Sequence, residues 1–169
     1  MTTVNTTAAS IGILVTLIVF TQLTSASSSL LSSKTFKTSY AATPPPASAP
    51  PGFAFTIVWV LLYGLAAVAL WLQITAPMHT ASAAVQWTGV AFMMLQLVIG
   101  FSWMPVFAAG HRKYATWMIV GMLMLSGVGI VLAAATNTVA AALWAPYVAW
   151  LVFALVLSAQ GNVNEVRPS

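Results

Sequence analysis

The sequence predicts an all-α integral membrane protein, a bundle of five transmembrane helices in a single domain over residues 1–169. The first observation is composition: 60% of the residues are apolar and only 4% are charged. A soluble domain carries about 25% charged residues and roughly half apolar ones, so this chain cannot cover a water-facing surface. The second observation is that the apolar residues form five continuous runs, each long enough to cross a bilayer as a helix.

The five predicted spans are separated by short polar or proline-rich segments. They cover residues 8–26, 53–76, 83–109, 115–136 and 140–160. None contains Lys, Arg, Asp or Glu, and the apolar residues are continuous rather than alternating, which favours helices over an outer-membrane barrel. The first span also has the length of a signal-peptide core, but no basic residue precedes it as a signal peptide requires. Cleavage after this span stays open as an alternative.

All five basic residues fall on one side of the predicted bundle. Lys34 and Lys37 precede the second span, Arg112 and Lys113 separate the third from the fourth, and Arg167 follows the fifth. Cytoplasmic loops carry the excess of Lys and Arg in multi-pass proteins. We therefore expect the N-terminus outside and the C-terminus in the cytoplasm, in a bacterial inner membrane or an organellar membrane.

Several kinds of chemistry lack the residues that they need. The chain has no Cys and only one acidic residue, so disulfides, thiolate metal sites and two-carboxylate hydrolysis are excluded. His79 and His111 lie in connections and are too far apart in sequence to suggest a metal site. Five basic residues are too few for a nucleic-acid groove, and no span holds the ionisable group that an ion-coupled transporter would use. We predict no metal site, no catalytic residue and no nucleic-acid partner.

The aromatic residues are the remaining candidates. Tryptophans gather at membrane interfaces, and Trp71, Trp87, Trp117 and Trp144 lie near span ends, as in such a belt. Three others lie deeper. At about 1.5 Å per residue, Trp59 and Trp103 are each roughly 9 Å from the basic-side end of their helix, and Trp150 is near the middle of the last span.

Helical spacing extends each deep indole into a stripe along one face of its helix. The stripes are Phe55, Trp59 and Tyr63; Gln96, Gly100, Trp103 and Phe107; and Tyr147, Trp150, Ala154 and Ser158. Rings mixed with small and weakly polar groups suit a flat apolar ligand, whereas direct packing of the three faces is the alternative. The loop at 27–52 contains five prolines, which disfavour helix, and is either a lid over the aromatic half or a plain linker.

Three segments resemble motifs of the TspO/translocator protein family, also called tryptophan-rich sensory proteins or peripheral-type benzodiazepine receptors. PPGFAFTIVWVLLY, from Pro50 to Tyr63 with Trp71 beyond it, is similar to the family run P-P-x-x-x-F-x-x-V-W-x-x-L-Y and its following Trp. QLVIGFSWMPVFAAGHR, from Gln96 to Arg112, resembles the third-helix segment Q-L-x-L-N-x-x-W-S-x-L-F-F-G. PYVAWLVFALVLS, from Pro146 to Ser158, resembles P-Y-x-x-W-x-x-F-A-x-x-L-N. The likeness covers all five spans in order.

The resemblance implies a five-helix bundle, often a homodimer, that binds porphyrins, haem-related tetrapyrroles, sterols or benzodiazepine-type drugs under its first loop. It implies ligand contacts at Trp59, Tyr63, Gln96, Trp103, Phe107, Trp150 and Ala154, and it retains Tyr40 and Pro46 of the family's first loop. Phe55 and Tyr147 from the stripes complete the candidate site. We expect a membrane receptor or carrier that takes a porphyrin or haem as ligand rather than as an obligatory cofactor, in sensing, transport or scavenging.

The chain departs from the family where light-dependent porphyrin breakdown has been proposed. The family's first loop usually reads W-Y-x-x-L-x-x-P-x-W-x-P-P, and Ser39 and Ser48 stand here at the two Trp positions. Serine cannot serve as an electron relay, so we expect binding without degradation. A light-dependent porphyrin-degrading enzyme remains the alternative.

Three further departures concern the inner cavity and sterols. Gly100 and Ser158 stand where the family usually has asparagines. Both changes enlarge the expected cavity or weaken its hydrogen bonding to a ligand. The C-terminal SAQGNVNEVRPS lacks the Tyr of the proposed cholesterol pattern, so sterol binding through that motif loses its support. A sterol-binding or structural membrane protein is the last alternative.

Overall fold

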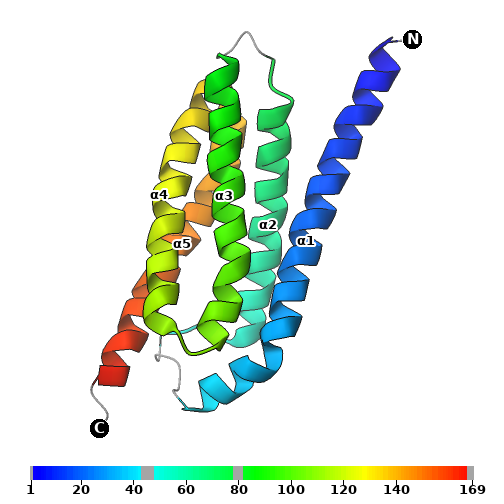
Figure 1. Cartoon of the computed structure of the whole chain (residues 1–169). Coiled ribbons are helices and arrows are strands. Elements are labelled where there is room, and N and C mark those ends of the chain that lie inside the picture. The colour runs from blue at the N-terminus through cyan, green and yellow to red at the C-terminus, as the bar shows by residue number, and fades with distance from the viewer. Residues whose placement is uncertain (1, 43–47, 78–81, 167–169) are drawn as a thin grey trace.

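The computed structural model describes residues 2–42, 48–77 and 82–166 (Figure 1). Over these residues the chain forms five helices: α1 Thr2–Ala42, α2 Gly52–Ile74, α3 Ala83–Ala108, α4 Arg112–Thr136 and α5 Thr138–Val166. Each is long and apolar enough to cross a membrane. The predicted all-α fold of five transmembrane helices is confirmed, and α2 to α5 begin and end within a few residues of the predicted spans, apart from the longer C-terminal end of α5.

The helices form one bundle with α1 on its outside. α3 packs on α4, α4 on α5 and α2 on α5, while α1 lies against α2 and α3. The N-terminal half of α1 leans away from the other helices, and the two chain termini lie at opposite ends of the bundle (Figure 1). The end of α1, the turn between α3 and α4 and the end of α5 share the lower end in this view.

The predicted boundary of the first span is wrong. The loop was expected at 27–52, but α1 continues to Ala42 and turns beneath the lower end of the bundle (Figure 1). No Pro or Gly occurs between residues 13 and 43, so nothing there interrupts the helical backbone bonds. Some of its hydroxyl groups bond within the helix, as where Thr24 Oγ1 donates to the Phe20 carbonyl at 2.7 Å. Any lid is therefore partly helical, and residues 43–47 lie outside the described part of the chain.

Two tight connections set the positions of the helices around the site. Gly110 adopts φ 84°, a left-handed conformation that suits glycine, and so lets the chain reverse within three residues between α3 and α4. At the other end, Gln86 Nε2 donates to the carbonyls of Gln73 at 2.7 Å and of Ile74 and Ala76 at 3.3 Å. This side chain satisfies the open carbonyls at the end of α2 and joins α2 to α3.

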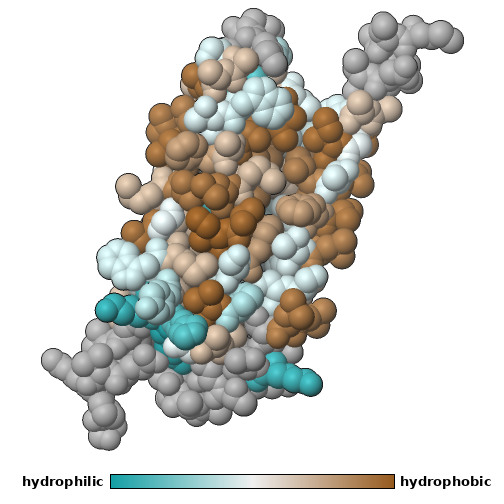
Figure 2. Space-filling view, viewed as in Figure 1, coloured by the Kyte–Doolittle hydropathy of each residue, from teal (hydrophilic) through white to brown (hydrophobic). Residues whose placement is uncertain are grey.

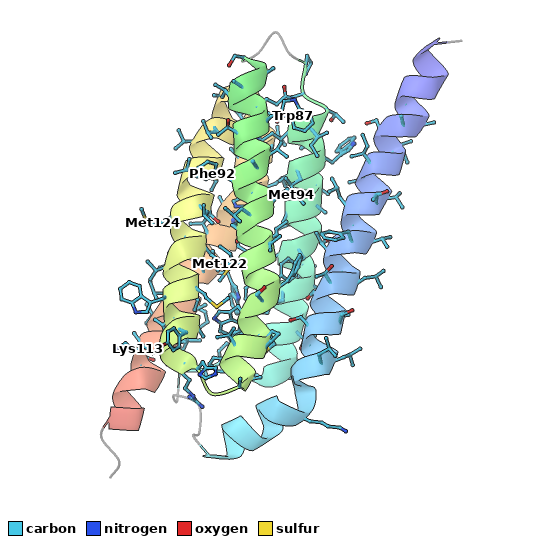
Figure 3. The ribbon with its side chains drawn as sticks, in the orientation of Figure 1. Trp87, Phe92, Met94, Lys113, Met122 and Met124 are labelled. Atoms are coloured by element: carbon cyan, nitrogen blue, oxygen red, sulfur yellow. The ribbon has the colours of Figure 1, made fainter. Side chains whose placement is uncertain are left out.

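The surface is that of a membrane protein. Apolar residues cover the middle of the visible face, and the most hydrophilic ones gather at its lower end (Figure 2). Side chains on α4 show both environments: Met122 lies between helices and is 1% exposed, whereas Met124 points outward and is 69% exposed (Figure 3). Water would not tolerate so many large apolar side chains on the outside, but lipid does.

Candidate functional site

The aromatic stripes of α2 and α5 meet inside the bundle. Phe55 contacts Trp150, with ring centroids 5.2 Å apart at an interplanar angle of 68°. Trp59 stacks on Tyr63 at 5.4 Å and meets Tyr147 and Trp150 edge-on at 5.9 and 6.3 Å. These five rings belong to two of the three predicted stripes, one on α2 and one on α5, and the two stripes face each other. We call Phe55, Trp59, Tyr63, Tyr147 and Trp150 the ring cluster.

The ring cluster is closed rather than open. Tyr63 and Tyr147 are 5% and 1% exposed, and each ring of the cluster contacts at least one other. An open space between these faces is one prediction from the sequence, but in the structure the rings pack against each other. A flat ligand would reach the tyrosines only after the rings separate.

A polar centre lies beside the two tyrosines, on α3. A Cβ built on Gly100 would lie 3.2 Å from the Tyr147 hydroxyl, 3.4 Å from the Met122 sulfur and 3.5 Å from the Tyr63 hydroxyl, so these three side chains occupy the space beside the glycine. Gln96, one turn away on the same face of α3, is fully buried and lies near the Tyr147 hydroxyl, but the geometry between the two side chains does not make a hydrogen bond.

Several polar atoms of this region have no hydrogen-bond partner within the described part of the chain. In the predicted site they are the Nε2 and Oε1 atoms of Gln96, the Tyr147 hydroxyl and the Trp150 Nε1 atom. Outside the predicted site they are polar atoms of Gln73, Ser126 and Trp144. An unpaired buried polar group costs about 1–3 kcal/mol. Such groups in a folded protein call for a bound molecule or water that completes their bonding.

The third deep indole points elsewhere. Trp103 stacks on Phe107 at 4.9 Å and donates its Nε1 hydrogen to the Ala115 carbonyl of α4 at 3.1 Å. The Arg112 guanidinium lies over the other ring of this pair, 5.4 Å from the Phe107 centroid, and Arg112 is only 9% exposed. Trp103 and Phe107 therefore form a separate α3–α4 stack near the basic end, with no described ring contact to Trp59 or Trp150.

The other predicted residues divide by what the structure describes. Ala154 is buried, 8% exposed, one turn beyond Trp150 on α5. The backbone of Tyr40 belongs to the last turns of α1, but its side chain lies outside the described residues, as does the whole of Pro46. Among the described residues no group of three or more His, Asp or Glu side chains could hold a metal ion.

Sequence reasoning missed two rings of the interior. Phe101 contacts Tyr63 at 5.1 Å and extends the cluster toward α1, where Phe20 lies 6.1 Å from it. Trp144 was expected in the interfacial belt, but it is fully buried and lies 5.5 Å from Tyr147. Trp144 lies near the start of α5, as the belt prediction requires, but its side chain points into the bundle and not toward lipid. The spacing of Trp144, Tyr147 and Leu151 along one helical face was the signal that would have found it.

The belt prediction holds better for the other tryptophans. Trp87 and Trp117 are 49% and 65% exposed near opposite ends of the bundle. Trp71 is half-buried and donates its Nε1 hydrogen to the Ser10 carbonyl at 2.8 Å, which joins α2 to α1. Belt residues and interior residues are thus distinguished by the direction of the side chain, not by its height in the span.

Comparison with known proteins agrees with this arrangement. The sequence profile of the TspO/MBR family matches residues 12–162, nearly the whole chain. The matched region contains most of α1, all of α2, α3 and α4, and most of α5. The protein is therefore an integral, multi-pass membrane protein, and it belongs to the TspO/MBR family.

Proposed function

We propose that this TspO/MBR-family protein binds a flat, largely apolar molecule of the tetrapyrrole class, such as a porphyrin or haem, between α2, α3 and α5. It would act in sensing, transport or scavenging. The observation that carries the proposal is the set of unpartnered polar atoms on Gln96, Tyr147 and Trp150 inside a buried aromatic cluster. A tetrapyrrole offers a flat face for the rings and ring nitrogens and carboxylates for the polar atoms.

The packing suggests an order of contacts for such a ligand. Trp59 and Trp150 are partly exposed and meet at nearly perpendicular planes, 88° apart, so a flat molecule would first displace this indole pair. The buried tyrosines lie behind it. Gln96 would then be the donor and acceptor that fixes the orientation of the bound molecule, because its amide presents both kinds of atom.

The test is a titration of the purified protein with protoporphyrin IX, followed by the porphyrin absorption band rather than by tryptophan fluorescence. Trp150→Ala should weaken binding roughly tenfold, about 1.4 kcal/mol, because it removes ring contact and an N–H donor. Trp87→Ala is the matched control, since Trp87 is 49% exposed and lines neither the ring cluster nor another described pocket. Equal affinity of the two variants would show that the ligand does not occupy the ring cluster.

The orientation of the protein follows as a second part of the proposal. Lys34, Lys37, Arg112 and Lys113 lie in segments that share the lower end of the bundle, so this end would face the cytoplasm. Because the chain has no Cys, single cysteines report the topology directly. A membrane-impermeant maleimide should label Ser82→Cys in intact cells and leave Lys113→Cys unlabelled, and the reverse pattern would invert the orientation.

A further inference from the structure

A groove runs along the outer face of the bundle between α3 and α4. It has a volume of about 710 Å³, and its walls include Val98 and Val106 of α3 and Trp117 and Met118 of α4. Val98 is 52% exposed and Trp117 is 65% exposed, so the groove faces the surroundings of the protein. It is separate from the ring cluster, because Gln96 and Gly100 lie on the buried face of the same helix α3.

The groove is deepened at a glycine, where no side chain fills the space between the neighbouring residues. Gly121 lines it, and a Cβ built on Gly121 would meet no atom within 4 Å. The exposed rings of Trp117 and Tyr114, one and two turns away on α4, line the groove with it. The hollow is therefore built by the order of large and small residues along α4, and a larger residue at 121 would fill it without a clash.

The groove changes character at its lower end. His111 and Tyr114 line it there, with ring centroids 6.1 Å apart, and exposed Lys113 lies between them in sequence at the start of α4 (Figure 3). Lys113 is not one of the lining residues; it is next to Tyr114 in sequence, and residues 83–136 contain no Asp or Glu that would neutralise its charge. The most hydrophilic part of the visible face coincides with this end of the bundle (Figure 2).

An open apolar groove that ends at the rings of His111 and Tyr114, beside an exposed lysine, is complementary to one kind of molecule. The groove lies on helices that cross the membrane, so lipids are the molecules that reach it. An acyl chain matches the apolar walls, Tyr and Trp rings prefer the headgroup level, and Lys attracts anionic headgroups. We propose that the α3–α4 groove is a binding site for an anionic glycerophospholipid, with its acyl chain beside Gly121 and its phosphate beside His111 and Lys113.

Native mass spectrometry of the detergent-solubilised protein tests the proposal. The wild-type protein is titrated with phosphatidylglycerol and with phosphatidylcholine of the same acyl chains. We expect retention of phosphatidylglycerol to exceed that of phosphatidylcholine by roughly fivefold, the effect of one basic residue at a membrane surface. Gly121→Leu should abolish the retained lipid because it fills the groove. Gly127→Leu is the matched control: it lies on α4 outside the groove, and a Cβ there also meets no atom within 4 Å.

A charge variant separates the headgroup from the acyl chain. Lys113→Gln should remove most of the preference for phosphatidylglycerol and leave phosphatidylcholine retention unchanged, and it does not alter the shape of the groove. The proposal is overturned if Gly121→Leu retains as much phosphatidylglycerol as Gly127→Leu, or if the wild-type protein retains both lipids equally. A change of oligomeric state in Gly121→Leu without loss of lipid would also overturn it, because the groove would then be a contact between copies of the chain. None of these outcomes depends on the proposed ligand of the ring cluster.

Discussion

The two sides of the ring cluster are joined to it in different ways. On one side, α2 and α5 interlock aromatic rings, with Trp59 in contact with both Tyr147 and Trp150. On the other side, α1 has one ring contact, between Phe20 and Phe101, and otherwise meets α2 and α3 through polar side chains that donate to backbone carbonyls. Gln22 Nε2 donates to the Val60 carbonyl at 3.0 Å and Ser28 Oγ to the Phe101 carbonyl at 2.7 Å.

The difference shows which wall of the site is weaker. Only 6% of the most apolar window of α1 is buried, against 33% for the windows of α2 and α5. Within a membrane there is little hydrophobic driving force between helices, so packing and hydrogen bonds must hold them together, and a hydrogen bond contributes about 0.6 kcal/mol on average. The α1 seam is therefore the wall that we expect to separate first, whereas the α2–α5 contact keeps the aromatic rings of the site packed together.

Removing a ring from the α2–α5 side should have the largest effect. Trp144→Ala deletes a fully buried indole that contacts Tyr147, and such a cavity costs about 3–5 kcal/mol. Unfolding of the detergent-solubilised protein, followed by circular dichroism during a denaturant titration, measures this loss. Trp144→Phe should cost much less, because it keeps a ring in the same space and removes an N–H without a described partner.

The control for this prediction is a tryptophan on the lipid side of the bundle. Trp117→Ala removes the same number of atoms from a side chain that is 65% exposed, and we expect a change within about 0.5 kcal/mol. If Trp144→Ala costs no more than Trp117→Ala, the α5 side does not hold the bundle as the packing indicates.

Weakening the α1 seam should have a smaller effect on stability and a visible effect on binding kinetics. Combining Ser28→Ala with Gln22→Leu removes two bonds from α1 to neighbouring helices, at about 0.6 kcal/mol each and at most about 1.7. Porphyrin association, measured by stopped-flow absorption, should become faster because α1 separates more easily from Tyr63 and Phe101. Ser102→Ala is the matched control, since the Ser102 hydroxyl bonds only the Val98 carbonyl of its own helix among the described contacts. An unchanged or slower association rate would place the entry route elsewhere.

The bounds of the helices differ in how well the sequence predicts them. The positions of α2 to α5 were predictable, because Pro and Gly or short polar turns end each apolar run. The length of α1 was not, since Ser, Thr and Ala between 24 and 42 are compatible with either a helix or a loop when nothing interrupts the backbone. Only the structure decides between these two.

The same distinction holds within the site. Phe55, Trp59 and Tyr63 share one face by spacing alone, and their contact with Trp150 and Tyr147 followed once α2 and α5 were neighbours. The direction of Trp103 depends on the sharp α3–α4 turn at Gly110, which brings Ala115 within reach of the indole. The closure of the cluster also depends on side-chain packing between helices, which spacing along one helix does not report.

The smallest expected effect concerns Ser48 in the segment after α1, where the resemblance to the family predicts a tryptophan. Ser48 donates its hydroxyl to Gln160 Oε1 at 2.7 Å, which ties the segment after α1 to the end of α5. A hydroxyl at that place does not release an electron to an excited porphyrin as an indole does, so illumination in air should bleach the bound porphyrin no faster than free porphyrin in detergent. Ser48→Trp restores an indole on the side where the cluster has none and should raise the bleaching rate above that of the wild-type complex. Faster bleaching by the wild-type protein would instead mean that an indole of α2 or α5 donates the electron to the excited porphyrin. An indole near residue 48 would then not be needed for porphyrin breakdown.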